Sequence, residues 1–272
     1  MRGKITSLIS LDLEEVERVL SREIAMLGQD EELIDILGYF FQKGGKRLRP
    51  MLTILSARCI RKEKPLSPSL IKVAVALELI HNASLIHDDV IDSSPYRRGQ
   101  LSLHEKFGSE TAVLAGDLLY TTAFDLILGE IENTILRDIL SCVRRMCQGE
   151  IREVQRRTLT REDYLKIIQD KTASLMSLCC KSGAILAGAS EEESKALEGF
   201  GLNFGILYQL IDDERDGDIP RVKGKEEIKL EFYRSRAQEH LSRIEESPYR
   251  DALYNLLTLI LFRREKELPL PS

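Results

Sequence analysis

Two acidic motifs, each at the end of an apolar stretch, constrain the fold of this chain most. The pattern DDxxD occurs at residues 88–92, after LELIHNASLI, and again at 212–216, after LNFGILYQLI. Both apolar stretches have helical character, and residues four apart on an α-helix share a face. Each motif therefore places its first and last aspartates together: Asp88 with Asp92, and Asp212 with Asp216.

Carboxylates at this spacing repel each other and weaken a helix by a few tenths of a kcal/mol per pair. A divalent cation removes that cost, and Mg²⁺ typically binds through one or two carboxylates, several waters and substrate phosphates. A single DDxxD is usually a solvated helix face. Both copies here end apolar segments, where charges are costly unless they are paired or metal-bound. The two motifs predict facing helices that clamp a diphosphate between metal ions.

The length and charge of the chain narrow the class of ligand. At 272 residues it is long enough to bury a substantial core. Its 39 basic and 44 acidic residues give a net charge of −5, which excludes the global basic field suited to nucleic acid. Basic residues instead gather at 43–49 and at Arg97-Arg98. This distribution favours a small anionic ligand and no nucleic-acid partner.

The cysteines and apolar stretches favour a cytoplasmic protein. The five cysteines are odd in number and lack CxxC spacing, so we expect reduced core residues. The N-terminus is amphipathic and has no apolar core of a signal peptide. Apolar stretches such as 71–80 are too short and interrupted to span a bilayer, so no transmembrane segment is predicted.

Helical periodicity runs through nearly the whole chain, without alternating strand patterns, internal repeats or a Pro/Ser linker. It predicts a loop at 217–229 and an all-α single domain over residues 1–272. The expected helices cover about 13–28, 31–42, a segment after Pro50, a segment from Ser67 or Ser69 through the first motif, 109–128, 131–157, 161–188, 191–217, 226–245 and 250–266.

The segment GGKRLRP at residues 44–50 puts three cations beside flexible backbone. Glycine lets backbone N–H groups approach an anion, while Lys and Arg supply point and forked charges for diphosphate oxygens. By itself such a segment is often only a surface turn. It is not a Walker A loop, and the chain also lacks GxSxG, HExxH and GxGxxG. Hydrolase, zinc-protease and dinucleotide-binding classes therefore have no support.

Several polar residues lie near the two motifs. Arg97 and Arg98 follow the first motif and either pair with its carboxylates or meet the same phosphate. A lone helical histidine is more often structural, but His81 lies two turns before Asp88 on the same face, which favours a ligand contact. Two further positions are weak signals individually: the pair Lys171-Thr172 interrupts an otherwise apolar helix, and Gln209 lies three residues before Asp212.

In this order, GGKRLRP, HNASLIHDDVID, the Arg-Arg-Gly, Lys171-Thr172 and YQLIDDERD resemble the trans-isoprenyl diphosphate synthases. The resemblance covers roughly residues 35–220, and the motifs are highly specific in combination. It implies an antiparallel helical bundle around a deep central cavity, usually as a homodimer. The implied substrates are isopentenyl diphosphate and an allylic prenyl diphosphate, and the lipid product is compatible with delivery to a membrane.

Matched position by position, the resemblance implies three Mg²⁺ ions. The implied metal ligands are Asp88, Asp92 and Asp212, supported by Asp216, Asp89 and Asp213. The allylic diphosphate would be held by Arg97, Lys171, Thr172 and Gln209. Isopentenyl diphosphate would be held by Lys46, Arg49, His81 and Arg98. Catalysis is thereby assigned to Asp88, Asp92, Arg97, Lys171 and Asp212, which stabilise the departing diphosphate. The released diphosphate takes the proton, so no side-chain base is required.

Product length depends on which residues line the path of the growing tail. Ala83 and Ser84, one turn before Asp88, are small, whereas short-product members of the family typically place an aromatic there. We therefore predict a long product of six or more isoprene units, with Phe124 as a deeper floor. Small residues are equally compatible with close helix packing.

The chain departs from the family after the second motif. GDIPRVKGKEEIKLEF is shorter than the usual segment and lacks TxP, and Lys223 or Lys225 is the candidate for a phosphate-binding lysine. Two alternatives follow. One is a class I terpene synthase or head-to-head condensing enzyme, which GGKRLRP and His81 disfavour because a cyclase has no second diphosphate. The other is a catalytically weak or silent subunit of a heteromeric synthase, which the short segment favours.

Overall fold

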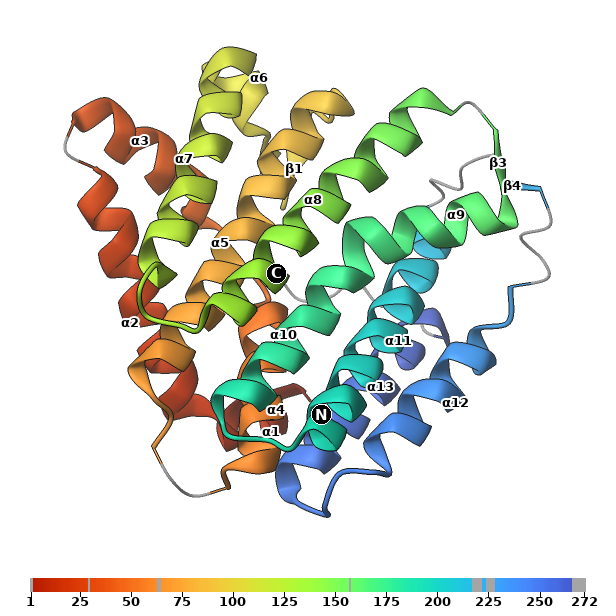
Figure 1. The fold of residues 1–272 in the computed structure, drawn as a ribbon. Helices are drawn as coiled ribbons and strands as arrows, with labels where there is room; N and C mark the ends of the chain where they lie inside the picture. The colour runs from red at the N-terminus through yellow and green to blue at the C-terminus, as the bar shows by residue number, and fades with distance from the viewer. Residues whose placement is uncertain are drawn as a thin grey trace. The chain divides into compact units, whose positions relative to one another are not determined.

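The computed structural model describes residues 2–28, 30–62, 65–156, 158–216, 222–223 and 228–265, almost all of them in helices (Figure 1). The all-α prediction is confirmed. The chain divides into two compact units. One unit comprises residues 1–10, 51–67 and 133–272, and the other comprises 11–50 and 68–132. We call these the C-terminal unit and the N-terminal unit. The predicted single domain stays a prediction.

The N-terminal unit is built around α5, Pro68–Ile91. This helix is apolar on almost every side because nearly all of its faces are buried, including Val73, Ala76 and Ile80. The other elements of this unit are α2 (Ser10–Leu27, whose first residue belongs to the C-terminal unit), α3 (Glu31–Gln42), β1 (Tyr96–Arg97), β2 (Gln100–Leu101), α6 (Leu103–Phe107) and α7 (Ser109–Ile127).

The helices α5 and α7 run antiparallel and lie side by side (Figure 1). The ion pair Lys72–Glu130 joins them beyond one end, and the His87 ring contacts Tyr120 near the other. A Cβ at Gly116 would collide with the His87 imidazole, so the absence of a side chain there permits the close approach. By interpolation between these contacts, Phe124 lies roughly level with Leu79, further from the first motif than Ala83.

The C-terminal unit contains most of the remaining helices. The pair α10 and α11 packs closely because a Cβ at Gly201 would lie 2.6 Å from the Met176 carbonyl oxygen. The helix α4 (Leu48–Ile60) begins in the N-terminal unit and continues here from Met51. The other elements are α1 (Arg2–Leu8), α8 (Asn133–Gln155), β3 (Leu159–Thr160), α9 (Arg161–Ile168), η1 (Gln169–Ala173), α10 (Ser174–Leu186), α11 (Glu191–Asp216), β4 (Val222–Lys223), α12 (Leu230–Leu241) and α13 (Pro248–Glu265).

Several local predictions need correction. The helix predicted over 161–188 is interrupted by a π-helical turn, η1, at residues 169–173. The helix predicted to begin after Pro50 begins at Leu48, since proline is tolerated in a first turn. The short helices α1 and α6 were not predicted separately, and four two-residue strands pair as β1 with β2, antiparallel, and β3 with β4, parallel. Cys147 is exposed rather than buried, although all five cysteines are free.

Among the described residues, α5 is long and apolar enough to cross a membrane by length and composition alone. Its most apolar window has a mean hydropathy of 1.5, and 72% of that window is buried within the protein. Such burial is typical of a core helix.

Candidate active site

The first acidic motif lies at the end of α5. The helix ends at Ile91, but the Asp92 N–H still donates to the Asp88 carbonyl at 2.8 Å, so both residues belong to the same turn. Asp88 is partly buried and Asp92 is exposed. Asp89 between them is only 2% exposed. The outer aspartates therefore face more solvent than the central one, as a metal shared with a soluble substrate would require.

Arg97 is held by the central aspartate of this motif. Its Nε donates to Asp89 Oδ1 at 2.8 Å and to Oδ2 at 3.1 Å. Burial opposes the charge of Arg97, but the hydrogen bond to Asp89 and the charges of Asp89, Asp88 and Asp92 outweigh it and raise the pKa of Arg97. The structure thus places this predicted diphosphate ligand within electrostatic reach of the whole first motif.

The basic segment 44–50 lies near His81. Burial lowers the pKa of His81 well below its usual value, and the positive charges of Arg49, Arg98 and Arg97 lower it further. His81 is therefore a neutral imidazole at physiological pH, surrounded by cations. Lys46 is exposed and Arg49 is partly buried. Within the N-terminal unit, Arg49 and Arg98, predicted with His81 to bind isopentenyl diphosphate, and Arg97, predicted to bind the allylic diphosphate, all lie within electrostatic reach of His81.

The second motif closes α11 in the C-terminal unit. Asp212 is partly buried, and Asp216 is the last residue of the helix. The central aspartate, Asp213, is held by two protein donors: Gln209 Nε2 at 2.6 Å and the Tyr164 hydroxyl. Burial, followed by the charge of Asp213, raises the pKa of Tyr164, so its hydroxyl stays protonated as a donor.

Lys171 and Thr172 lie in the π-helical turn η1. Turns of this kind often occur at functional sites. Lys171 forms ion pairs with Glu150 and Glu153 of α8, and Thr172 Oγ1 donates to Gln209 Oε1 at 2.8 Å. The Thr172 contact joins η1 to α11, one turn before Asp212. The Gln209 amide oxygen accepts from Thr172 and its amide nitrogen donates to Asp213, so Gln209 is a positioning residue in this structure.

Gly149 of α8 provides the space that η1 occupies. A Cβ at Gly149 would lie 2.9 Å from Lys171 Cγ and 3.2 Å from Asp170 Cβ. Asp170 is buried and accepts hydrogen bonds from Arg152 at 2.5 Å and Lys166 at 3.0 Å. These contacts anchor the residue before Lys171 and so restrict where the Lys171 side chain can reach.

The carboxylates of the two acidic motifs are the type of ligand that a hard divalent cation prefers. Asp88, Asp92, Asp212 and Asp216 offer only oxygen ligands, which Mg²⁺ prefers. In the part of the chain that the structure describes, no three His, Cys, Asp or Glu side chains gather closely enough to hold a metal by themselves. Mg²⁺ usually takes one or two carboxylates and completes its coordination with waters and substrate phosphates.

The predicted product-length residues lie on α5 and α7. Ala83 is fully buried, Ser84 is partly buried and donates to the His81 carbonyl at 2.9 Å, and Phe124 is partly buried. The segment that departs from the family pattern is largely outside the described residues. Lys225 lies there, and of Lys223 only its backbone in β4 is described.

Sequence reasoning missed the residues that position the predicted ligands. Buried charges within apolar helices were the available signal, since such charges need partners. Glu78, inside the apolar stretch before His81, is the clearest example. The missed residues are Glu17, Arg47, Glu78 and Asn82 in the N-terminal unit, and Glu150, Arg152, Glu153, Tyr164 and Asp170 in the C-terminal unit.

Comparison with known proteins identifies the family of this chain. A model of the family described as polyprenyl synthetase matches residues 30–226. The octaprenyl diphosphate synthase of Escherichia coli K12 is 36% identical over 217 residues, covering 78% of this chain and 65% of the relative. The geranylgeranyl diphosphate synthase of Methanosarcina mazei is 38% identical over 214 residues, covering 75% of this chain and 64% of the relative. The chain thus spans less than two thirds of the length of these relatives.

A solved structure shares the fold over nearly the whole chain. The polyprenyl synthase from Caulobacter crescentus CB15, complexed with calcium and isoprenyl diphosphate, superposes with a TM-score of 0.86 at 25% identity. The match covers 97% of this chain and 98% of that one. The resemblance drawn from the motifs is confirmed: this chain belongs to the polyprenyl synthetase family.

Proposed function

We propose that this protein is a Mg²⁺-dependent prenyltransferase that condenses isopentenyl diphosphate with an allylic prenyl diphosphate. The observation that carries the proposal is the layout of α5. His81, with arginines around it, and Asp88, which begins a carboxylate pair, lie seven residues apart on this one helix. At the rise of an α-helix that separation is roughly 10 Å. One rigid element thus presents an anion-binding cluster and a cation-binding pair, as two neighbouring diphosphates require.

The proposed reaction has three steps. The allylic C–O bond breaks, and the diphosphate leaves with the electron pair. The isopentenyl double bond then attacks the allylic cation and forms the new C–C bond. Finally, the released diphosphate takes a proton from the condensed cation, and a double bond forms. The product is an all-trans prenyl diphosphate one isoprene unit longer.

The chain's own cations act where negative charge develops. Arg97 and Lys171 would contact the departing diphosphate, and contacts that strengthen in the transition state accelerate the reaction. Lys46, Arg49, His81 and Arg98 would bind the second diphosphate and orient the isopentenyl double bond. Neutral His81 would donate a hydrogen bond without adding charge. Thr172 and Gln209 would support Lys171 and Asp212.

The metal sites are proposed at the outer aspartates. Asp88 and Asp92 would hold Mg²⁺ on one side of the allylic diphosphate, and Asp212 with Asp216 on the other, for three ions in total. Bound Mg²⁺ would neutralise the charge that appears on the leaving diphosphate. The proposal requires the two motifs to face each other across that diphosphate.

We further propose a long-chain product. Ala83 and Ser84 leave no aromatic side chain one turn before Asp88, and Phe124 lies deeper along α7. The octaprenyl diphosphate synthase of E. coli is among the similar relatives, although a geranylgeranyl diphosphate synthase is equally similar. A tail of six or more isoprene units would run past Ala83 towards Phe124.

A homodimer in the cytoplasm is the proposed assembly. One face of α8 is buried in the C-terminal unit, while Leu140, Cys147, Ile151 and Val154 are exposed at helical spacing on another. A second copy of this chain is the proposed cover for that apolar stripe. Ile151→Glu should then shift the protein from dimer to monomer in light scattering, whereas a monomeric wild type would contradict the assembly. Five free cysteines support the cytoplasmic location.

The test of the activity is incubation of the purified protein with farnesyl diphosphate, radiolabelled isopentenyl diphosphate and Mg²⁺. Incorporation of label into a longer prenyl diphosphate is expected, and chromatography gives its length. Formation of a cyclic hydrocarbon without use of isopentenyl diphosphate would instead identify a terpene cyclase. Addition of EDTA should abolish incorporation.

A second candidate is a weak or silent subunit of a heteromeric synthase. The sequence after Asp216, shorter than the family pattern and without TxP, favours it. Under this alternative the purified chain incorporates no label alone but gains activity when a second synthase polypeptide is added. The incubation described above, run with and without such a polypeptide, separates the two functions.

A further inference from the structure

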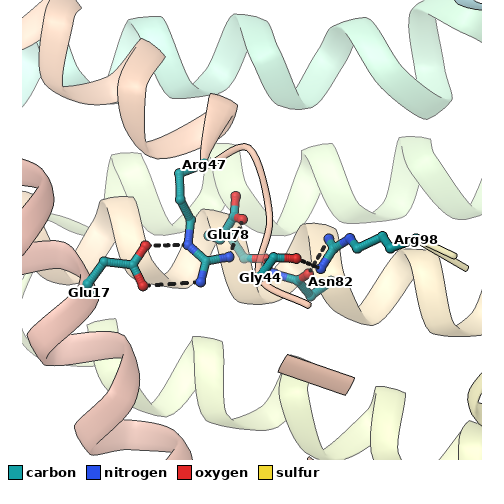
Figure 2. Close-up of polar contacts among 6 residues, drawn as sticks. All are labelled: Glu17, Gly44, Arg47, Glu78, Asn82 and Arg98. Carbon is teal, nitrogen blue, oxygen red and sulfur yellow. Dashed lines mark hydrogen bonds and ion pairs between the residues drawn. The ribbon is translucent and has the colours of Figure 1, made fainter. Parts of the chain in front are cut away.

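Arg47, in the basic segment, uses its guanidinium in contacts within the protein. Arg47 adopts a left-handed backbone conformation, with φ of 50°, that is uncommon outside glycine. Its Nε and Nη2 donate to the two carboxylate oxygens of Glu17 at 2.5 and 3.1 Å, and its Nη1 donates to Glu78 at 3.3 Å (Figure 2). Arg47 therefore connects α2 to α5 through the segment that also carries Lys46 and Arg49.

Glu78 is a buried carboxylate, 2% exposed, on α5. Its Oε1 accepts the Arg47 hydrogen bond, and its Oε2 has no hydrogen-bond partner among the described residues. A buried charge is unfavourable unless opposite charges compensate it. Arg47 and Arg98 supply that compensation, because the negative charge of Glu78 acts on both guanidinium groups.

Three charged side chains converge over Gly45. A Cβ on Gly45 would lie 2.9 Å from Arg47 Nη1, 3.3 Å from Arg98 Nη2 and 3.5 Å from Glu78 Oε1. Two guanidinium groups this close repel each other, and Glu78 is the carboxylate placed beside both. Gly45 thus provides the space, and Glu78 the charge, that let the two arginines approach.

Arg98 is fixed by the same group of residues. Its Nη1 donates to the Gly44 carbonyl, and its Nη2 donates to Asn82 Oδ1 at 3.2 Å (Figure 2). Asn82 in turn donates to the Glu78 carbonyl at 2.7 Å, one turn back along α5. The guanidinium also lies 5.7 Å from the centre of the Phe40 ring. Arg98 is thereby held next to His81 by side-chain and backbone acceptors.

We propose that Glu78 is a positioning residue that sets the geometry of the isopentenyl diphosphate site, acting through Arg47 on the segment 44–49 and directly on Arg98. Arg47 is a positioning residue too, and not a ligand, whereas Lys46 and Arg49 keep the ligand role proposed above. This inference rests on the proposed function. It adds to that function the two residues, Glu78 and Arg47, on which the placement of the second diphosphate depends.

The experiment compares steady-state KM values for the two substrates in Glu78→Gln and wild type. Glutamine keeps the shape and removes the charge, so KM for isopentenyl diphosphate should rise about 10-fold, the effect of one lost charged contact. KM for the allylic substrate should not change. A merely structural loss would affect both substrates alike. The control is Glu130→Gln. It removes the carboxylate that pairs with Lys72, which lies on α5 as Glu78 does, and it should leave both KM values unchanged.

The double variant Arg47→Gln/Glu78→Gln tests whether Arg47 acts on the site through its pairing with Glu78. If it does, the KM of the double variant for isopentenyl diphosphate equals that of Glu78→Gln, because non-additivity marks residues that share one interaction. Multiplied effects would mean that Arg47 contacts the substrate independently and would overturn its assignment as a positioning residue.

The outcomes separate the inference from the function on which it rests. If wild-type protein incorporates no isopentenyl diphosphate, alone or with a second synthase polypeptide, the proposed function is wrong. If the wild type is active and folded Glu78→Gln keeps the wild-type KM, the inference is wrong. Should Glu78→Gln fail to fold, Glu17→Gln replaces it, since Glu17 is 46% exposed at the outer end of the network. It should raise KM for isopentenyl diphosphate about three-fold, and an unchanged value overturns the inference.

Discussion

Asp89 and Arg97 form an ion pair in which the carboxylate is buried and both of its oxygens accept from the same guanidinium nitrogen, at 2.8 and 3.1 Å. The second motif has a parallel arrangement, because Asp213 accepts from Gln209 and Tyr164. In both motifs the central carboxylate is bound by protein donors. The proposed function assigns these central carboxylates to positioning and the first and last aspartates to metal ligation.

This division of roles predicts different kinetics for neighbouring substitutions. Asp88→Asn should lower kcat by about 10²–10³, the usual effect of losing one transition-state contact, and should raise the Mg²⁺ concentration needed for half-maximal rate. Asp89→Asn should lower kcat by about 10-fold, because Arg97 loses its anchor, without changing the Mg²⁺ requirement. Rates measured across a Mg²⁺ titration distinguish the two. Equal shifts in the Mg²⁺ requirement would show that Asp89 is itself a ligand.

Lys171 is predicted to contact the leaving diphosphate, so its removal should slow the chemical step. Lys171→Ala should reduce kcat by about 10²–10³, and it should also lower thermal stability because Glu150 and Glu153 lose the cation between them, so assays belong well below the lowered Tm. The matched control is Lys181→Ala, since Lys181 also pairs with two carboxylates, Asp138 at 2.9 Å and Glu198 at 3.4 Å. It should retain wild-type kcat. Single-turnover rates with saturating substrates provide the comparison, and similar rates for the two variants would remove Lys171 from the mechanism.

His81 gives a prediction that does not depend on activity. Its pKa in the folded protein is depressed by burial and by Arg49, Arg98 and Arg97. Below about pH 6.5 the unfolded chain takes up a proton that the folded chain does not. The free energy of unfolding should therefore fall as pH decreases below 6.5, until the depressed pKa is reached, by up to about 1.4 kcal/mol per pH unit from this group.

Urea denaturation of wild type and His81→Gln between pH 7.5 and 5.5 measures this contribution. The difference in unfolding free energy between the two proteins should change with pH in the direction stated, with wild type losing more stability on acidification. Parallel pH profiles would mean that His81 titrates alike in the folded and unfolded chains. Bound pyrophosphate should reduce the wild-type loss, because an anion favours the protonated ring.

The helices and the types of candidate ligand could be predicted from the sequence. The contacts that hold those side chains in place could not. The helix at 31–42 was predicted with its observed bounds, since apolar periodicity and Gly44-Gly45 mark its extent. The π-helical turn at 169–173 was not, because one extra residue per turn barely alters an apolar pattern. The network around Glu78 joins Gly44 to Arg98, 54 residues apart, and local patterns contain no information about such a contact.

The chain-length proposal leads to a contrasting pair of predictions. Ala83→Phe should place an aromatic floor one turn before Asp88 and shorten the product. Ala76→Phe, two turns deeper on α5, lies beyond the level of Phe124, so it should leave the product length unchanged and serves as the matched control. Both alanines are fully buried, so each phenylalanine should also cost roughly 1–3 kcal/mol of stability, and assays belong well below the lowered Tm.

The comparison of Ala83→Phe with Ala76→Phe separates a blocked tail path from overpacking. Ala76 is as fully buried as Ala83, so the overpacking cost is comparable, but it lies further from Asp88 than Phe124 does. Thin-layer chromatography of dephosphorylated products from wild type and the two variants gives the three lengths. A shorter product from Ala83→Phe alone is expected, because a floor nearer the reacting carbon stops elongation earlier. Equal lengths in all three proteins would place the tail elsewhere, and equal shortening by both variants would assign the effect to overpacking.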